Sequence, residues 1–460
     1  MKKIAINTFL SLFLIFSIPL SIVAQNPIIQ NVYTADPAPM VHNDTLFLFT
    51  GHDEDNATEK GFIMKDYLCF STTDMVNWTQ HAPIFNVDSL GWAAKYNANA
   101  AQVAYRNGKY YFYISPWSGL ADGGDCISVV VSDSPYGPFK DALGKPLISP
   151  SQTKYNPHLW EDIDPTVFID DDGQAYLYWG NNSLYCVKLN EDMISYSGDI
   201  ITFDIKDKSA FGSDYEEAPW FFKRNDTYYL FYAAHIPEAI YYATSSSPLG
   251  PWKYGGVIMK GMAQGCNGNH PGVIQYKGNW YLFYFNQDLP GGHDKRRAVN
   301  VIPFDFNTDG SISELSHSKA GVTKPVANLN PYIQTEAETM AWEVGVETTS
   351  DSKTRVYVTD VDNGDYIKVR SVDFGKGAKS FEASVASASQ GGKIEIHTDS
   401  LSGPLLGTCM VESTGDWQKW VTKKCVIRNT KGVHDIYFIF IGGKEKMFNF
   451  DWWKFSTKKR

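Results

Sequence analysis

The sequence predicts an all-β protein, built as a five-bladed β-propeller followed by a β-sandwich (jelly-roll) domain. Two observations carry this prediction. A turn-and-strand unit recurs five times between residues 25 and 310, and a separate run of short strands occupies residues 332–460. Few stretches show the periodicity of an amphipathic helix. We therefore expect two β domains, joined by a linker at residues 311–331.

The N-terminal segment, residues 1–24, has the features of a secretory signal. Lys2 and Lys3 precede an apolar run that ends at Leu20, and small residues lead up to Ala24. The apolar run is short for a membrane span, and no later stretch is long and apolar enough to cross a bilayer. We expect an exported protein, periplasmic or extracellular, with no membrane insertion.

Charge and cysteine content exclude some classes of protein. The formal net charge is -10, with no basic run, which argues against nucleic acid and anionic membranes as partners. Six cysteines in 460 residues are too few for a disulfide scaffold. Cys409 and Cys425 flank one hairpin-like segment and could pair in an oxidising compartment, but the sequence leaves this open.

The unit that recurs in the first domain is a turn followed by an aromatic and aliphatic strand. Its copies occupy residues 44–50, 107–114, 172–179, 225–232 and 277–284. Turn residues before such strands are a hairpin signal. The period of about 50–65 residues suits one four-stranded propeller blade with its loops. Five units imply five blades, and the alternative is a large sandwich with accidental similarity.

The pattern stops after Asp309-Gly310. Residues 311–331 have little strand character and are predicted to be the linker. Short strands then follow at residues 366–369, 380–384, 393–397, 417–421, 435–441 and 448–455. Short strands at this spacing favour a β-sandwich.

Three acidic residues stand at equivalent places in the repeat. Asp36 precedes the first blade, Asp164 the third and Glu217 the fourth, each beside a proline and a short apolar strand. The inner strands of a propeller line one central channel, so acids at the mouths of different blades converge. A proline directly after Asp36 and Asp164 predicts extended backbone at both acids. Strand capping would explain one such acid, but not three in register.

The region from about residue 27 to 312 resembles glycoside hydrolase family 43, five-bladed propeller enzymes that cleave arabinofuranosides and xylosides with inversion. The runs that carry the resemblance include Ala35-Asp-Pro-Ala-Pro-Met40, Phe49-Thr-Gly-His-Asp53, the stretch 163–180, Asn269-His-Pro-Gly272 and Leu289-Pro-Gly-Gly292. Within the family, the chain is most similar to exported arabinoxylan arabinofuranohydrolases. The resemblance implies an enzyme that removes α-L-arabinofuranosyl side chains from arabinoxylan or a related plant hemicellulose. A β-xylosidase, or a dual arabinofuranosidase/xylosidase, is the alternative on the same fold.

The resemblance also implies roles for the three acids. Asp36 matches the general base that activates water, and Glu217 matches the general acid that protonates the leaving oxygen. Asp164 matches the third carboxylate, which orients the acid and keeps its pKa raised. Glu216 is the less suitable acid, because the family motif places the acid directly before a small residue and proline. Inversion implies roughly 6.5–9.5 Å between the carboxyls of base and acid.

Further residues of the catalytic domain are implied in the same way. His270 resembles the histidine of the propeller axis that often lies near a bound calcium ion, through water, although a buried, hydrogen-bonded histidine is the alternative. Arg297 resembles the arginine close to the base. Asn99 stands where many relatives carry a tryptophan that walls the sugar pocket, which leaves sugar specificity open. Trp92 or Trp117 could supply that wall from a loop.

Residues 332–455 resemble a carbohydrate-binding module of family 6. The runs that carry this resemblance include Asp362-Asn-Gly-Asp-Tyr366, Thr414-Gly-Asp-Trp-Gln-Lys-Trp420 and Asn449-Phe-Asp-Trp-Trp453. The resemblance implies a structural calcium ion, for which carboxylate oxygens are suitable ligands. The implied ligands are Glu336, Glu338 and Asp451.

The same resemblance implies a sugar site at a loop edge of the module. Trp417 would stack on a sugar ring and Asn449 would hydrogen bond to it. The second aromatic residue of that site falls near Asp360 in this sequence. The alternative is a module that only packs on the propeller.

Two rival functions remain to be weighed. Retaining fructosidases, also five-bladed propellers, resemble Asn-Asp-Pro-Asn-Gly at the first acid and Arg-Asp-Pro at the second, whereas Asp36 and Asp164 lie in other contexts here. A non-catalytic carbohydrate-binding protein would be expected to lack one of the acids. All three acids are present, and Asn99 is the only hint of such a protein.

Overall fold

The computed structural model describes residues 25–94, 97–121, 123–153, 155, 157–213, 215–262, 266, 268–351, 355–444 and 446–459. The predicted secretory signal at 1–24 lies outside the described residues. Apart from one 3-10 turn (Val87–Ser89) and a short helix α1 (Lys208–Phe211), the regular elements of these residues are strands. No helix in the described part of the chain is long and apolar enough to span a membrane. The predicted all-β class is confirmed.

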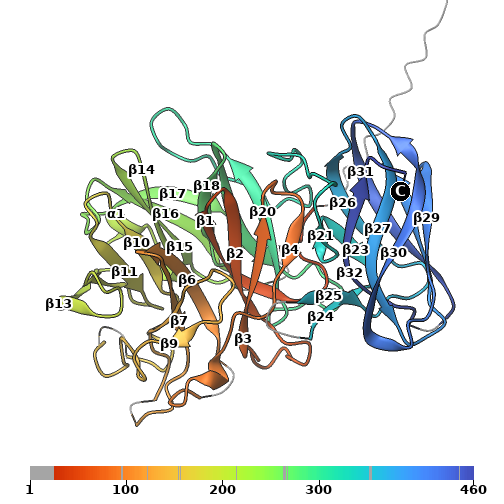
Figure 1. Ribbon diagram of the computed structural model, residues 1–460. Helices are drawn as coiled ribbons and strands as arrows, with labels where there is room; N and C mark the ends of the chain where they lie inside the picture. The colour runs from red at the N-terminus through yellow and green to blue at the C-terminus, as the bar shows by residue number, and fades with distance from the viewer. Residues whose placement is uncertain are drawn as a thin grey trace, which may run out of the picture.

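Five antiparallel sheets follow one another along the first domain (Figure 1). In each sheet the principal strands pair in chain order. Their strands are β1 (Thr34–His42), β2 (Thr45–His52), β3 (Asp66–Thr72), β4 (Trp78–Gln80) and β5 (Phe85–Asn86); β6 (Asn99–Arg106), β7 (Lys109–Ser115), β8 (Ser128–Ser132) and β9 (Lys140–Asp141); β10 (Thr166–Ile169), β11 (Ala175–Trp179), β12 (Tyr185–Leu189) and β13 (Tyr196–Thr202); β14 (Tyr215–Arg224), β15 (Thr227–Ala234), β16 (Ala239–Ser245) and β17 (Lys253–Met259); and β18 (Gly272–Tyr276), β19 (Asn279–Asn286) and β20 (Ala298–Phe304).

The recurring unit of the sequence forms the second strand of each sheet, in β2, β7, β11, β15 and β19. The turns before these strands explain why. Asn107 and Gly108, for example, both have positive φ, at 52° and 81°. Two successive residues with positive φ make the type I′ turn that suits a tight hairpin. The repeat is therefore a local hairpin signal that the structure uses five times.

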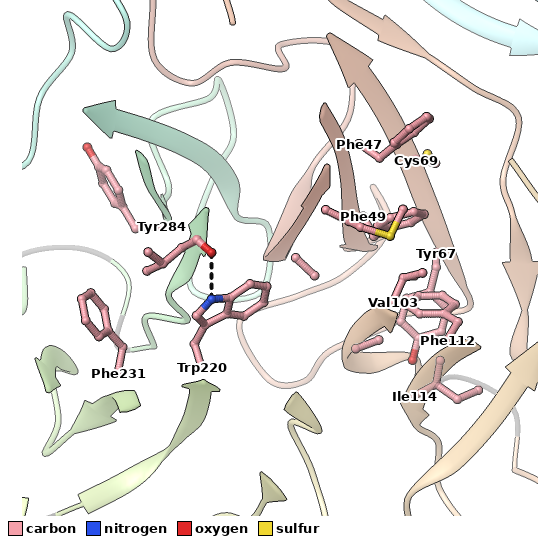
Figure 2. Packing of buried hydrophobic residues seen from close by; sticks show 14 of the residues in the cluster. Phe47, Phe49, Tyr67, Cys69, Val103, Phe112, Ile114, Trp220, Phe231 and Tyr284 are labelled. Carbon is pink, nitrogen blue, oxygen red and sulfur yellow. Dashed lines mark hydrogen bonds between the residues drawn. The ribbon is translucent and has the colours of Figure 1, made fainter. Parts of the chain in front are cut away.

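The first strands of the five sheets contact one another in a closed circuit: β1 with β6, β6 with β10, β10 with β14, β14 with β18, and β18 with β1. Buried aromatic side chains fill the space between neighbouring sheets, as Figure 2 shows for Phe49, Tyr67 and Phe112. The indole nitrogen of Trp220 on β14 donates a hydrogen bond over 2.9 Å to the carbonyl oxygen of Val273 on β18.

The segment that follows the predicted signal is part of this fold and lies along β20. The Ile28 N–H donates to the Val299 oxygen over 3.0 Å, and the Thr34 N–H donates to the Arg297 oxygen over 2.9 Å. These bonds fix the beginning of β20 against the beginning of β1. They thereby bring Arg297 next to Asp36, although the two residues are far apart in the sequence.

The second domain is a β-sandwich, as predicted (Figure 1, blue). Two sheets, in the orders β24-β25-β32-β27-β30 and β23-β26-β31-β28-β29, enclose a core that includes Phe381, Phe438 and Trp453. The strands are β21 (Thr335–Glu336), β23 (Trp342–Val344), β24 (Glu347–Ser350), β25 (Val356–Thr359), β26 (Tyr366–Asp373), β27 (Ala378–Ser387), β28 (Gly392–Thr398), β29 (Leu405–Val411), β30 (Asp416–Thr430), β31 (Val433–Gly442) and β32 (Asn449–Ser456). Cys409 and Cys425 form no disulfide, but a hydrogen bond joins their side chains, so their pairing stays open.

The sandwich is docked directly onto the first sheet of the first domain. Strand β22 (Thr339–Met340) pairs with the outer strand β4 and extends that sheet. The side chain of Asn77 also exchanges two hydrogen bonds with the backbone of Arg370, of 2.9 Å and 2.7 Å. The predicted linker also contacts the sandwich, because the Leu329 N–H donates to the Ser371 oxygen over 3.0 Å.

Candidate active site

Asp36 lies in a bulge of β1, between Ala35 and Ala38, where the pairing with β2 shifts register. Its φ is 52°, and that of Asp164, just before β10, is 60°. The prediction of extended backbone at both acids was therefore wrong. Aspartate tolerates the left-handed region better than most residues. Tertiary contacts on the two carboxylates, described below, outweigh the local preference set by the following prolines.

Arg297, directly before β20, holds Asp36 in place. Its Nη1 donates to Asp36 Oδ1 over 3.0 Å. The same guanidinium binds Asp53 at the end of β2 through Nε and Nη2, at 2.9 Å each. Asp53 is fully buried, at 0% exposure. Arg297 thus contacts the expected base, and it also binds Asp53, which the sequence analysis did not single out.

Glu217 lies on β14 between two register shifts of the pairing with β15. Its carboxylate accepts a hydrogen bond from Asn181. The next residue, Ala218, has a φ of 57°, and its N–H donates to Asp164 Oδ2 over 3.0 Å. Glu217 and Asp164 are therefore neighbours, although they belong to different sheets.

The electrostatics show that the three acids share one environment. Desolvation raises the pKa of Glu217 to about 7, and the negative charges of Asp36 and Glu216 add to this effect. Desolvation also raises the pKa of Asp164, followed by the charges of Glu217 and Asp36. Like charges that approach in low-dielectric surroundings favour the neutral form of one another. A carboxyl group whose pKa is raised toward neutral pH is suited to act as a general acid.

His270 is buried, and neither of its ring nitrogens makes a well-formed hydrogen bond within the described residues. Burial lowers its pKa, and the charge of Asp36 partly opposes this. The imidazole is therefore neutral and close to the expected base. A buried ring without partners of its own suits a position next to water or a ligand.

Asn99 and Trp117 gather around a further buried acid, Asp125. The Asn99 Nδ2 donates to Asp125 Oδ1 over 2.9 Å, and Trp117 forms a β-bridge with Asp125. Desolvation raises the pKa of Asp125 to about 8. The indole nitrogen of Trp92 donates to Asp141 Oδ2 over 2.8 Å. The side chain of Trp92 is thus tied to β9, the outer strand of its sheet.

The three acids expected to bind calcium line one cavity of about 650 Å³ between the two domains, together with Arg355 and Tyr136. These acids are Glu336, Glu338 and Asp451. Glu338 Oε2 is buried and has no hydrogen bond within the described residues. Burial, with the charges of Glu336 and Asp451, raises the pKa of Glu338. Within the described residues, no group of three or more His, Cys, Asp or Glu side chains already has the arrangement of a metal site.

The expected sugar site of the sandwich is altered. Asn449 is 2% exposed, and its amide already accepts from Thr359 and donates to the Trp417 oxygen, both over 2.9 Å. The ammonium of Lys446 lies 5.4 Å from the centre of the Trp417 ring and 2.9 Å from Asp360 Oδ1. Sugar binding by Trp417 and Asn449 stays a prediction.

Comparison with known proteins gives the family. Residues 24–312 match the glycosyl hydrolases family 43, and residues 336–457 match the carbohydrate binding module (family 6). An arabinoxylan arabinofuranohydrolase of Bacillus subtilis (strain 168) is 34% identical over 94% of this chain and 92% of its own. A xylosidase/arabinosidase of Bacteroides ovatus is 29% identical over 61% of this chain and 94% of its own.

Solved structures agree. A family 43 arabinoxylan arabinofuranohydrolase from Bacillus subtilis, in complex with cellotetraose, has a TM-score of 0.82 and 34% identity, over 95% of this chain and 98% of that one. A family 43 β-xylosidase/α-arabinofuranosidase from a compost microbial metagenome, in complex with xylotriose and free of calcium, has a TM-score of 0.55 and 27% identity, over 63% and 96%. These matches confirm the resemblance seen in the sequence: the chain is a glycoside hydrolase and belongs to family 43.

Proposed function

We propose that the protein is an exported hydrolase that removes α-L-arabinofuranosyl side chains from arabinoxylan or a related plant hemicellulose, with inversion. The observation that carries this proposal is the gathering of Asp36, Asp164 and Glu217 from three different sheets into one set of interacting acids. A relative that is 34% identical over 94% of the chain and is named for that substrate supports it. A β-xylosidase or dual activity is the second candidate, because other relatives are named xylosidase/arabinosidase.

In this mechanism the protonated form of Glu217 gives its proton to the leaving glycosidic oxygen. Asp36 takes a proton from a water molecule, which attacks the anomeric carbon from the opposite side. Asp164 accepts a hydrogen bond from the Ala218 N–H and thereby holds the backbone next to the acid. Arg297 holds the carboxylate of Asp36. Inversion requires roughly 6.5–9.5 Å between the two reacting carboxyls.

The five sheets are, in this proposal, the five blades of one propeller, and their closed circuit of first-strand contacts supports that count. In this proposal His270, whose pKa is lowered by burial and partly restored by the charge of Asp36, contacts a water-bound calcium ion in the propeller axis. In the sandwich, the unpartnered oxygen of Glu338, with Glu336 and Asp451 nearby, suits a second calcium ion. Calcium at that position would stabilise the module without taking part in the chemistry.

The stereochemical course tests the proposal. NMR during hydrolysis of an aryl α-L-arabinofuranoside should show the β-anomer of the sugar before mutarotation, and added methanol should not be glycosylated. Sugars released from arabinoxylan, compared with rates on the aryl arabinofuranoside and aryl xyloside, decide between the two substrate classes. A first product with the anomeric configuration of the substrate would overturn the assigned roles.

Substitution of the acid tests its assignment. Glu217→Gln should lower activity by on the order of 10²–10⁴-fold on substrates with poor leaving groups, and by less on activated aryl glycosides. Glu216→Gln is the matched control, because it changes the adjacent carboxyl and should retain most activity. If Glu216→Gln were the inactive variant, the acid would be misassigned.

A further inference from the structure

A fourth carboxyl group, that of Glu238, contacts the proposed acid. Glu238 lies directly before β16, at the end of the hairpin that connects β15 to β16, and is 6% exposed. Its Oε2 accepts the backbone N–H of Asn269 over 2.5 Å. Its side chain also forms a hydrogen bond with Glu217. Glu238 therefore joins Glu217 to the segment that carries His270.

A hydrogen bond between two carboxyl groups requires that one of them carries a proton. Burial raises the pKa of Glu238 well above its usual range, followed by the charge of Glu217. Two ionised carboxylates in contact at a buried site would repel one another. When Glu217 ionises, the proton of the pair therefore stays on Glu238.

We infer that Glu238 is a positioning residue that remains protonated and donates a hydrogen bond to the carboxylate of Glu217. The inference rests on the proposed role of Glu217 as general acid. Asn181 donates to the same carboxyl group. Two donors thus receive the negative charge that forms when Glu217 gives its proton to the leaving group, and the proton of Glu238 itself is not transferred.

Two variants separate this role from simple support of the loop. Glu238→Gln keeps an N–H donor for Glu217 and an oxygen acceptor for the N–H of Asn269. Glu238→Leu removes both. The measurement is the pH dependence of kcat/KM on an aryl glycoside with a poor leaving group. The alkaline limb of this pH profile reports the ionisation of Glu217 in the free enzyme. Glu191→Gln, at an exposed position, is the control for a lost carboxylate.

The expected result is an order of effects. In Glu238→Gln the alkaline limb stays within about 0.5 pH unit of wild type, with less than about a tenfold loss of rate. In Glu238→Leu the alkaline limb moves to higher pH by about one unit or more, because the Glu217 anion loses a hydrogen-bond donor. A downward shift in Glu238→Gln would mean that Glu238 is charged. Equal limbs in wild type and both variants would mean that Glu238 only supports the loop.

Infrared difference spectra keep the inference testable if Glu238→Leu fails to fold. Wild type minus Glu238→Gln at about pH 8 should contain the carbonyl band of a protonated carboxylic acid, and the absence of that band would overturn the inference. Glu217→Gln distinguishes the two levels of proposal. If this variant remains fully active on substrates with poor leaving groups, the proposed function is wrong. If it is impaired but the Glu238 variants show no shift, only this inference fails.

Discussion

Arg297 donates a hydrogen bond from Nη1 to Oδ1 of Asp36 over 3.0 Å, from a position 261 residues further along the chain. Its Nε and Nη2 donate to Asp53. All three side chains are buried. One buried cation therefore compensates two buried anions, and the expected base takes its orientation from this arrangement.

Replacing Arg297 by methionine should destabilise the protein by about 3–5 kcal/mol, because it leaves buried carboxylates without a counter-charge. Activity should also fall, since Asp36 loses the group that orients it. Urea denaturation and kcat/KM measure the two effects. The neighbouring Arg296→Met is the control. It should lower the free energy of unfolding by less than about 1 kcal/mol, because the partly exposed Arg296 side chain does not compensate a buried carboxylate. Equal losses in both variants would contradict the arrangement.

The pH dependence of activity should follow Glu217. A general acid works only when protonated, so kcat/KM should be high below about pH 7 and should fall as the pH rises through about 7, the value to which desolvation raises the pKa of Glu217. The measurement is a pH profile on a poor leaving group. The residual activity of Glu217→Gln on activated glycosides should lack this alkaline limb, and a limb that persists there would assign it to another group.

The pH dependence of stability should follow Asp125 in part. Desolvation raises the pKa of Asp125 from 3.8 to about 8. A carboxyl group with a raised folded-state pKa contributes stability that is present below pH 3.8 and is lost as the pH rises through about 8. Asp125→Asn should therefore reduce the difference in stability between pH 5 and pH 8, as measured by urea denaturation. Asp133→Asn, at an exposed ion pair, should leave that difference as it is in wild type.

Calcium should stabilise the sandwich through Glu338. Adding calcium to protein treated with a chelator should raise the thermal midpoint, because an ion that binds only the folded state stabilises it. Glu338→Gln should abolish this rise, since it removes one charge at the buried oxygen that lacks a partner. Glu382→Gln, which alters an ion pair with Lys424 instead, should retain the rise. A calcium effect that survives Glu338→Gln would place the ion elsewhere.

The hairpins were predictable because their signal is local. Turn residues such as Asn107 and Gly108 accept positive φ, and the aromatic strand follows within a few residues. The three acids were also predictable, because Asp36, Asp164 and Glu217 stand next to the same kinds of neighbour in each repeat.

The contacts between distant segments were not predictable from the sequence. Arg297 meets Asp53 only because β20 closes beside β1, and Glu238 meets Glu217 only because β14 and the β15–β16 hairpin belong to one sheet. No residue type or spacing near Asp53 or Glu238 indicates a partner far away in the chain. The pairing of β22 with β4 is of the same kind, because the free edge of a strand accepts any partner with a compatible register.

The positive φ angles of Asp36 and Asp164 place function and stability in opposition. Glycine adopts this conformation without the steric cost that a side chain brings. The contacts of the two carboxylates, with Arg297 and with the Ala218 N–H, offset that cost in the folded protein. A glycine would therefore relieve the backbone but leave a buried donor without its acceptor at each site. The strained backbone at both aspartates is thus kept in place by the rest of the fold and not by the local sequence.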